Sequence, residues 1–330
     1  MINILLVTDW ARDDFKFSEV ARELRRLGVR ARIAHDVRPT IKHRLWSLGI
    51  ETKVISMFPL KSFLPEWAEI WQQKNYTKIE EYRALEKAGI PVPKWVPVYR
   101  GQNPDLSGFS EYVVVKPALG WRGAFVRILR RAKVSYRPIA TDVMDGVVSP
   151  ALIAQEYIHT GAWPISYRVA TVFGEPIFMF RSMANANRLP FIGSTFDADF
   201  FTGRSIVATA QGCLRDEEVP EDVIDLARQA HRQAFPDIPL LGFDIVRDCK
   251  SNQLFVLEVN AFGRTYLLSE YDSKRHLEEF GFDLHKQFGG VKAAARGIYR
   301  RLFWKNQDIQ NQEEHIQLSN ERKLKTCAAS

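Results

Sequence analysis

The feature that most constrains this chain is the stretch from residue 240 to residue 263, LLGFDIVRDCKSNQLFVLEVNAFG. Two apolar runs, residues 243–246 and 254–259, flank a polar cluster at residues 248–252. Apolar runs of this length on either side of turn-forming residues are typical of a β-hairpin. The chain must therefore build a sheet that contains this hairpin.

The hairpin carries acidic side chains on one face. A three-residue loop at residues 250–252 would place Asp244 directly opposite Glu258, and alternation along the strand puts Asn260 on the same face as Glu258. Two facing carboxylates repel each other unless a positive charge lies between them. Magnesium takes carboxylate and amide oxygens and leaves other positions to substrate phosphates. A magnesium site and a surface hairpin with solvated acids both remain open.

Size and composition describe an ordinary globular chain. It has 330 residues, of which 46% are hydrophobic and 26% are charged, so it can bury a large core. The N-terminus has no basic segment and reaches Asp9 before any long apolar run, so we expect no signal peptide, no transmembrane segment and a cytoplasmic location. The formal charge of +7 favours anionic partners without choosing among nucleotides, acidic metabolites, lipid and nucleic acid.

Cysteine usage excludes two classes of scaffold. The three cysteines, Cys213, Cys249 and Cys327, lie far apart without paired spacing. This pattern argues against a disulfide framework and against a zinc site.

The first 74 residues predict a small open sheet. Apolar runs at residues 2–7, 29–34 and 53–56 predict strands, and residues 17–27 have helical periodicity. The order indicates a βαβαβ unit. No glycine-rich loop follows the first strand, so we do not predict a dinucleotide site there.

Two lysines and a glycine loop are candidates for phosphate binding. Lys78 begins a predicted helix over residues 75–88, and Lys116 ends an apolar strand that leads to Gly120 and Gly123. Glycines allow backbone N–H groups to approach a phosphate. A solvated helix lysine and an ordinary hairpin turn explain the same residues equally well.

A second hairpin is predicted over residues 167–181. A two-residue turn at Gly174 and Glu175 would set Arg168 directly across from Arg181. Paired arginines on one face repel unless an anion lies near them. They would hold such an anion or else splay into water.

The C-terminal part begins with a basic amphipathic segment over residues 289–305. Such a helix can lie on anionic lipid or bind nucleic acid, although a packed helix with a solvated basic face is the simpler interpretation. From residue 306 onward the chain is polar and poor in aromatic residues, which predicts a tail without a core of its own.

Taken in order, these signals resemble the ATP-grasp superfamily over residues 75–270, and within it carboxylate–amine ligases of the ribosomal-protein glutamate-ligase and glutathione-synthetase type. The resemblance implies an α/β (α+β) fold in which two α+β lobes clamp ATP behind a small Rossmann-like N-terminal domain. The implied divisions are residues 1–74, 75–160, 161–288 and 289–330.

The resemblance also implies roles for individual residues. The nucleotide-binding residues it implies are Lys78, Lys116, Gly120, Gly123, Gln155, Glu156, Tyr157 and Ile158, the last four as the adenine hinge with Tyr157 and Ile158 reading the base through their backbone. The magnesium ligands it implies are Asp244, Glu258 and Asn260. The residues it implies at the reacting phosphate and acyl group are Arg168, Arg181 and Gly263.

Two positions depart from the family pattern. Ser166 stands where relatives often have an acidic residue, which leaves a ribose or substrate contact open. Residues 261–264 read Ala-Phe-Gly-Arg where a Pro-Gly turn is usual, which leaves open whether the Gly263 N–H keeps the family's role near the acyl group.

The activity implied by the resemblance is amide or peptide bond formation through an acyl phosphate, with release of ADP and phosphate. ATP and Mg²⁺, or Mn²⁺ in its place, would be the cofactors. A small carboxylate and an amine, such as an amino acid or a peptide, would be the substrates. No nucleic acid is expected, and a homo-oligomer is compatible with the family. The alternatives are a phosphotransferase with the same nucleotide site and a non-catalytic protein that binds polyanions.

Overall fold

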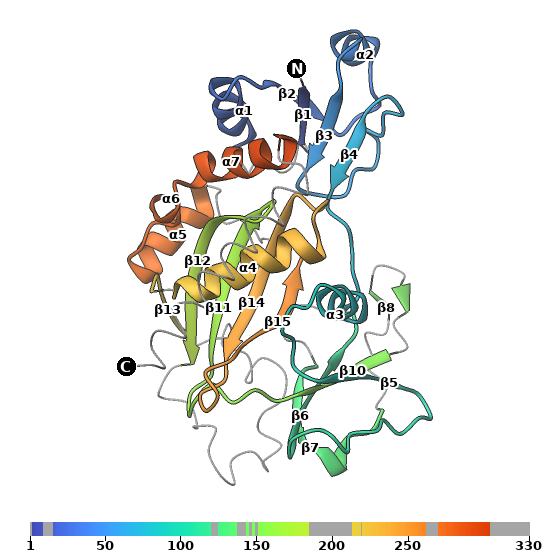
Figure 1. The fold of residues 1–330 in the computed structure, drawn as a ribbon, viewed down its shortest axis with the longest axis vertical. Helices are drawn as coiled ribbons and strands as arrows, with labels where there is room; N and C mark the ends of the chain where they lie inside the picture. Colours follow the sequence, from blue (N-terminus) through green and yellow to red (C-terminus); the bar gives the residue numbers. More distant parts are fainter. Residues whose placement is uncertain are drawn as a thin grey trace, which may run out of the picture.

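The computed structural model describes the chain in nine segments, which are residues 2–8, 16–119, 125–136, 143–144, 147–148, 151–184, 213–218, 220–261 and 270–303. These segments form a five-stranded sheet, two four-stranded sheets and a two-stranded ribbon. In Figure 1 the N-terminal sheet lies at one end of the long axis, the five-stranded sheet in the middle and the second four-stranded sheet at the other end. Among the described helices, none has the length and apolar character of a membrane span.

The N-terminal sheet is parallel and confirms the βαβαβ prediction. Its strands run in the order β2-β1-β3-β4, and the central strand β1 is buried along its whole length, as expected for a parallel sheet covered on both faces. The elements are β1 (Asn3–Thr8), α1 (Phe17–Arg26), β2 (Arg30–His35), α2 (Ile41–Ser47), β3 (Thr52–Ser56) and β4 (Glu69–Gln72). The βαβαβ order implied a helix at the place of α2 without giving its bounds, and β4 was not predicted.

The second sheet is antiparallel, with strand order β5-β10-β6-β7, and α3 lies beside it. Helix α3 begins at a capping box in which Thr77 accepts from the Glu80 N–H, and it ends before Gly89, whose φ is +69°. The elements are α3 (Lys78–Lys87), β5 (Trp95–Tyr99), β6 (Tyr112–Pro117), β7 (Arg127–Arg130), the 3₁₀ turn η2 (Arg131–Lys133), the ribbon of β8 (Val143–Met144) and β9 (Val147–Val148), and β10 (Ala151–Glu156).

The five-stranded sheet is antiparallel, with order β13-β12-β11-β14-β15. Helix α4 crosses one face, where Val223 and Ala227 pack with Val169 and Phe243, and the C-terminal helices cover the other face (Figure 1). The elements are β11 (Ile165–Val172), β12 (Glu175–Ala184), β13 (Cys213–Asp216), α4 (Glu221–Ala234), β14 (Leu240–Arg247), β15 (Leu254–Asn260), α5 (Glu270–Phe280), α6 (Leu284–Gln287) and α7 (Gly290–Phe303).

Helix α7 joins the five-stranded sheet to the N-terminal sheet through a shared apolar core. Ala293, Ala294 and Ile298 are buried together with Leu24 of α1 and Phe178 of β12. The contact is so close that a Cβ atom built on residue 297 of α7 would lie 2.1 Å from a backbone carbonyl oxygen of β11. Only glycine allows this approach. The expectation that this segment is a packed helix is confirmed.

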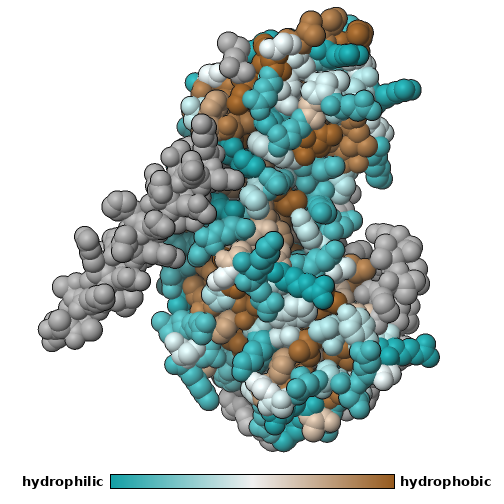
Figure 2. Space-filling view, turned by 45° about the vertical axis from the view of Figure 1, so that its right-hand side comes forward, coloured by the Kyte–Doolittle hydropathy of each residue, from teal (hydrophilic) through white to brown (hydrophobic). Residues whose placement is uncertain are grey.

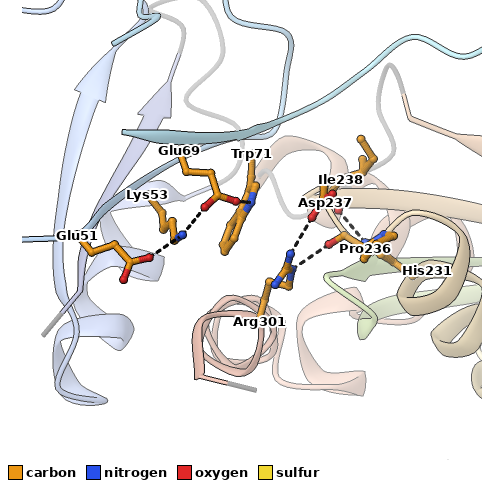
Figure 3. A network of polar contacts seen from close by, with 9 residues as sticks. All are labelled: Glu51, Lys53, Glu69, Trp71, His231, Pro236, Asp237, Ile238 and Arg301. Atoms are coloured by element: carbon orange, nitrogen blue, oxygen red, sulfur yellow. Dashed lines mark hydrogen bonds and ion pairs between the residues drawn. The ribbon is translucent and has the colours of Figure 1, made fainter. Parts of the chain in front are cut away.

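The basic side chains of α7 bind acidic partners within the protein. Arg296 Nε lies 3.1 Å from Glu175 Oε1, and Arg300 pairs with the other oxygen of the same carboxylate. Figure 3 shows Arg301 between Trp71 of β4 and the loop after α4, where it donates to Asp237 at 2.7 Å and stacks 4.6 Å from the Trp71 ring. The predicted solvated basic face is therefore largely an internal ion-pair surface.

Candidate functional site

The β14–β15 hairpin places the predicted acids together. Asp244 is the direct partner of Glu258 in the sheet register, which confirms the predicted opposition, and Arg168 of β11 is the partner of Asp244 on its other side. The Asn260 amide nitrogen donates to Asp244 Oδ2 at 3.2 Å. One face of the sheet thus carries a row of Arg168, Asp244 and Glu258, with Asn260 beside it.

A β-bulge, rather than the predicted three-residue loop, produces this register. Past Asp244 the pairing shifts by one residue, so that Ile245 faces Val256 and Leu257 is the extra residue. The strands then continue to a longer loop closed by the Asp248 N–H, which donates to the Gln253 carbonyl. The longer loop shifts the register in one direction and the bulge shifts it back. The pairing of Asp244 with Glu258 was therefore predicted correctly although the predicted loop length was wrong. Bulges often lie beside functional sites, where they redirect backbone groups.

The bulge directs the Leu257 carbonyl toward α3 and β6. This oxygen accepts hydrogen bonds from the Tyr82 hydroxyl and from Lys116 Nζ, the latter at 3.1 Å. Lys116 Nζ also donates to the Tyr82 oxygen at 2.8 Å, and its ammonium lies over the Tyr82 ring. Tyr82 therefore links the bulge to the lysine that ends β6.

Two ion pairs connect the acids to basic residues. Lys78 Nζ lies 3.0 Å from Glu258 Oε1, and Arg168 binds Asp244 in a bidentate manner, with Nη2 2.6 Å from Oδ2. Burial disfavours the charged form of Glu258, but Lys78, Lys116 and Arg168 outweigh burial and hold its pKa below the ordinary value. The Glu258 carboxylate is therefore ionised at neutral pH, and both Glu258 and Asp244 have a cationic partner.

Two further titrating groups lie at the same place. Burial lowers the pKa of Lys116 to about 8, against the opposing attraction of Glu258. Burial also raises the pKa of Glu81 to about 8, against the opposing effect of Lys78. Glu81 Oε2 accepts from the Val259 N–H at 3.4 Å, so it ties α3 to the strand that carries Glu258. Such clustering of shifted groups is common at functional sites.

The donor set is suitable for a magnesium ion. Asp244 and Glu258 supply two carboxylates and Asn260 supplies an amide. These are hard oxygen donors on neighbouring positions of the sheet. In the described part of the chain, no group of three or more His, Cys, Asp or Glu side chains could hold a metal ion. A magnesium ion at this place would therefore have two carboxylates and an amide from the protein, with water or substrate phosphates as its other ligands.

The predicted hinge lies at the end of β10, whose last two residues are Gln155 and Glu156. Gln155 is buried, while the Glu156 carboxylate accepts from the Ser110 N–H at 3.0 Å. Tyr157 and Ile158 follow the strand, and the Tyr157 N–H donates to the Tyr112 carbonyl.

The predicted pairing of the two arginines is wrong. The turn lies at Phe173 and Gly174, one residue earlier than expected, and a β-bulge with Ile177 as the extra residue shifts the register once more. Arg181 therefore pairs with Tyr167, while Arg168 pairs with Phe180. Since side chains alternate, Arg181 lies on the face opposite Arg168. Its guanidinium is 3.3 Å from the Glu218 carboxylate. Arg168 therefore meets the acidic row without Arg181.

Some candidates were missed and others lie outside the described residues. Tyr82 and Glu81 were not predicted, although their spacing of four and three residues from Lys78 puts them on the same helix face. Gly120, Gly123 and Gly263 lie outside the described residues.

No protein-family model and no curated protein match this sequence. Solved structures are similar over most of its length. D-cycloserine synthetase DcsG is 16% identical, with 91% of this chain and 99% of that chain covered and a TM-score of 0.47. The ATP-grasp ligase PsnB, complexed with a minimal precursor, is 16% identical over 89% and 98%, with a TM-score of 0.48.

D-alanine–D-alanine ligase from Bacillus anthracis is 12% identical over 91% of this chain and 99% of that chain, with a TM-score of 0.45. These matches cover nearly the whole length of each of the three proteins. At such identities and scores, the functional argument rests on the residues of the site itself.

Proposed function

We propose that this protein is an ATP-grasp enzyme that joins a carboxylate to an amine at the expense of ATP. The observation that carries the proposal is the convergence of Lys78, Lys116 and Arg168 on the opposed carboxylates Asp244 and Glu258. Phosphoryl transfer needs positioning and charge neutralisation more than covalent help from the protein, and this cluster supplies both.

The nucleotide would lie between the second sheet and the five-stranded sheet. In this proposal Lys78 and Lys116 turn from Glu258 and Leu257 to the phosphates of ATP. Gln155 to Ile158 would receive adenine, and the loop containing Gly120 and Gly123 would approach the phosphates. The proposed units are residues 1–74, 75–160, 161–288 and 289–330.

Asp244, Glu258 and Asn260 would hold a magnesium ion. When bound, that ion would neutralise phosphate oxygens and supply positive charge where the transferred group becomes more negative. Arg168 is released from Asp244 in this arrangement, so its guanidinium becomes available to bind the phosphoryl oxygens. The protein thus exchanges internal ion pairs for pairs with its substrates.

The reaction has two steps. A substrate carboxylate oxygen attacks the γ-phosphorus of ATP, the bond to the β–γ bridging oxygen breaks, and ADP leaves with an acyl phosphate in place. The amine nitrogen then attacks the carbonyl carbon, phosphate leaves with the carboxylate oxygen, and the nitrogen loses a proton. Lys78 and Lys116 would hold the phosphates through the first step, which accounts for a site built of cations rather than a nucleophile.

Oxygen transfer tests this proposal directly. If a carboxylate substrate carries heavy oxygen, a ligase delivers one labelled oxygen to the released phosphate, because the acyl carbon–oxygen bond is the one that breaks in the second step. Hydroxylamine in place of the amine should yield a hydroxamate. Transfer of phosphate to a stable product, with no label in free phosphate, would refute the ligase and indicate a phosphotransferase.

A matched pair of lysine variants controls this experiment. Lys116→Ala should abolish label transfer, whereas Lys94→Ala should not, because Lys94 is an exposed lysine of the same lobe whose Nζ donates to the Gly108 carbonyl and not to the Leu257 carbonyl. Equal loss in both variants would show a general effect of lysine removal rather than a role of Lys116.

A further inference from the structure

Helix α2 turns an apolar face to solvent. Ile41, Leu45 and Leu48, the last being the residue that ends the helix, are 66%, 63% and 73% exposed. Their spacing of four and three residues places them on one side of the helix. We call these three side chains the α2 face.

The other side of α2 is anchored to the N-terminal sheet, which fixes the direction of the α2 face. The His43 ring meets Phe63 edge-on at 5.2 Å, and Trp46 packs into the apolar cluster that contains Phe63 and Val54. Ser47 is buried and donates to the His43 carbonyl. These contacts fix the orientation of α2 on the N-terminal sheet. Because His43, Trp46 and Ser47 face the sheet, Ile41, Leu45 and Leu48 face solvent.

Exposed apolar side chains concentrate in this part of the molecule. Of the eleven large apolar side chains that are exposed among the described residues, seven lie from Leu27 to Leu64. Figure 1 shows α2 at the extreme end of the long axis, and Figure 2 shows apolar groups gathered at that same end. Single exposed leucines are common, but a concentration of this kind marks an interaction surface.

The surroundings of the α2 face are basic. Arg32, Arg38, Lys42 and Arg44 are all exposed. Asp36 is the only acidic residue from position 30 to position 50, and its carboxylate accepts three backbone N–H groups of the loop after β3. The next acidic residue, Glu51, pairs with Lys53, so residues 30–50 carry a large excess of positive charge.

The charge of this surface and the position of Trp46 argue against two other partners. A second copy meeting the molecule at the same face would bring like charges together, which disfavours self-association. Recognition of single-stranded nucleic acid uses exposed aromatic rings, but the Trp46 ring already contacts Arg30 and Arg32, whose guanidinium carbons lie 5.4 and 5.0 Å from its centroid. Aliphatic side chains among cations at a convex tip suit a flat anionic surface.

We propose that the α2 face and its surrounding cations bind the surface of an anionic lipid membrane. The aliphatic side chains enter the boundary between headgroups and acyl chains, and Lys42 and Arg44 remain with the anionic headgroups. Three aliphatic side chains give weak and reversible attachment. The active site would then work near a membrane, at the opposite side of the N-terminal sheet from the bilayer.

Vesicle sedimentation tests this inference. The full chain should bind vesicles of phosphatidylcholine mixed with phosphatidylserine, and binding should weaken with added salt and with phosphatidylcholine alone. The double variants Leu45→Ser/Leu48→Ser and Lys42→Glu/Arg44→Glu should each lower the vesicle partition coefficient by about tenfold or more. Leu277→Ser removes an exposed leucine of α5 and should leave binding unchanged.

Three results would contradict the membrane inference. Absence of binding to the mixed vesicles refutes the inference, as does binding that both double variants retain. A concentration-dependent dimer that Leu45→Ser/Leu48→Ser converts to monomer would assign the face to protein contact instead. ATP turnover should be the same in all of these variants, because the substituted residues are remote from the proposed site, so failure of the membrane inference and failure of the proposed ligase are distinguishable.

Discussion

Removing the Tyr82 hydroxyl should impair catalysis without unfolding the protein. Tyr82→Phe keeps the buried ring that packs 5.3 Å from Trp95 but removes the oxygen that links Lys116 Nζ to the Leu257 carbonyl. A hydrogen bond to a charged group is worth about 1.5 to 3 kcal/mol. If that energy positions Lys116 and the bulge for ATP, kcat/KM for ATP should fall by about 10- to 100-fold.

The pH profile adds a second signature to Tyr82→Phe. The pKa of Lys116 is already lowered to about 8, so activity that needs its charged form should decline as the pH rises through about 8. Loss of the acceptor oxygen disfavours the ammonium further, and the alkaline limb of kcat/KM should move to lower pH.

ADP release at varied ATP concentration and pH measures both effects of Tyr82→Phe. Tyr76→Phe is the control, since Tyr76 packs against Phe235 and is not among the contacts of Lys116. A Tyr82→Phe enzyme with unchanged kcat/KM and an unchanged alkaline limb would refute a positioning role for the hydroxyl.

Three further predictions follow from buried groups. Glu258→Gln should lower ATP turnover about 100-fold or more, because the charge that faces Lys78 and the proposed magnesium is lost while the shape remains, and steady-state ADP release measures this. Gly297→Ala should lower the free energy of unfolding by about 3 kcal/mol in urea titrations, since its Cβ would lie 2.1 Å from the Val172 carbonyl oxygen. His231 is buried and burial lowers its pKa to about 3, so its contribution to stability is complete above pH 6.5 and is lost as the pH falls from 6.5 toward 3. The loss should reach about 2 kcal/mol at pH 5 in urea titrations.

Each of these predictions has a control and a contradicting result. Full turnover in Glu258→Gln would remove this carboxylate from the proposed metal site. Gly108→Ala should be nearly neutral because no atom lies within 4 Å of the added Cβ, and equal stability of Gly297→Ala would disprove the close approach of α7. A His231→Gln variant should lose this part of the acid sensitivity. An unchanged pH dependence in that variant would assign the sensitivity to other groups.

Much of the fold was predictable because its signals are local. The parallel N-terminal sheet followed from three apolar runs and one amphipathic helix, and α3 followed from its periodicity and Gly89. The bounds of α2 were missed although Ile41, Leu45 and Leu48 have helical spacing, because a seven-residue helix is shorter than the window over which periodicity identifies a helix. The capping box at Thr77 and Glu80 was present in the sequence as a signal for the start of α3.

The site was predictable only where residues lie within one hairpin. Asp244 and Glu258 are joined by a short segment, so their opposition could be expected even though the bulge could not. The pairing of Arg168 with Asp244 and of Lys78 with Glu258 depends on contacts between residues far apart in the chain. The hydrophobic periodicity of a segment carries no information about contacts between residues far apart in the chain. The β-bulge between the turn at Phe173 and Arg168 has no signal in the sequence, and its one-residue shift is what places Arg181 on the face opposite Arg168.

The measurement that tests the central claim most directly is release of ADP and phosphate from ATP with magnesium, with pooled carboxylates and amines, by the native protein and by Lys116→Ala. The account predicts release that requires one carboxylate together with one amine and disappears in the variant. Absence of ATP binding by the native protein, or equal release by the variant, would contradict it.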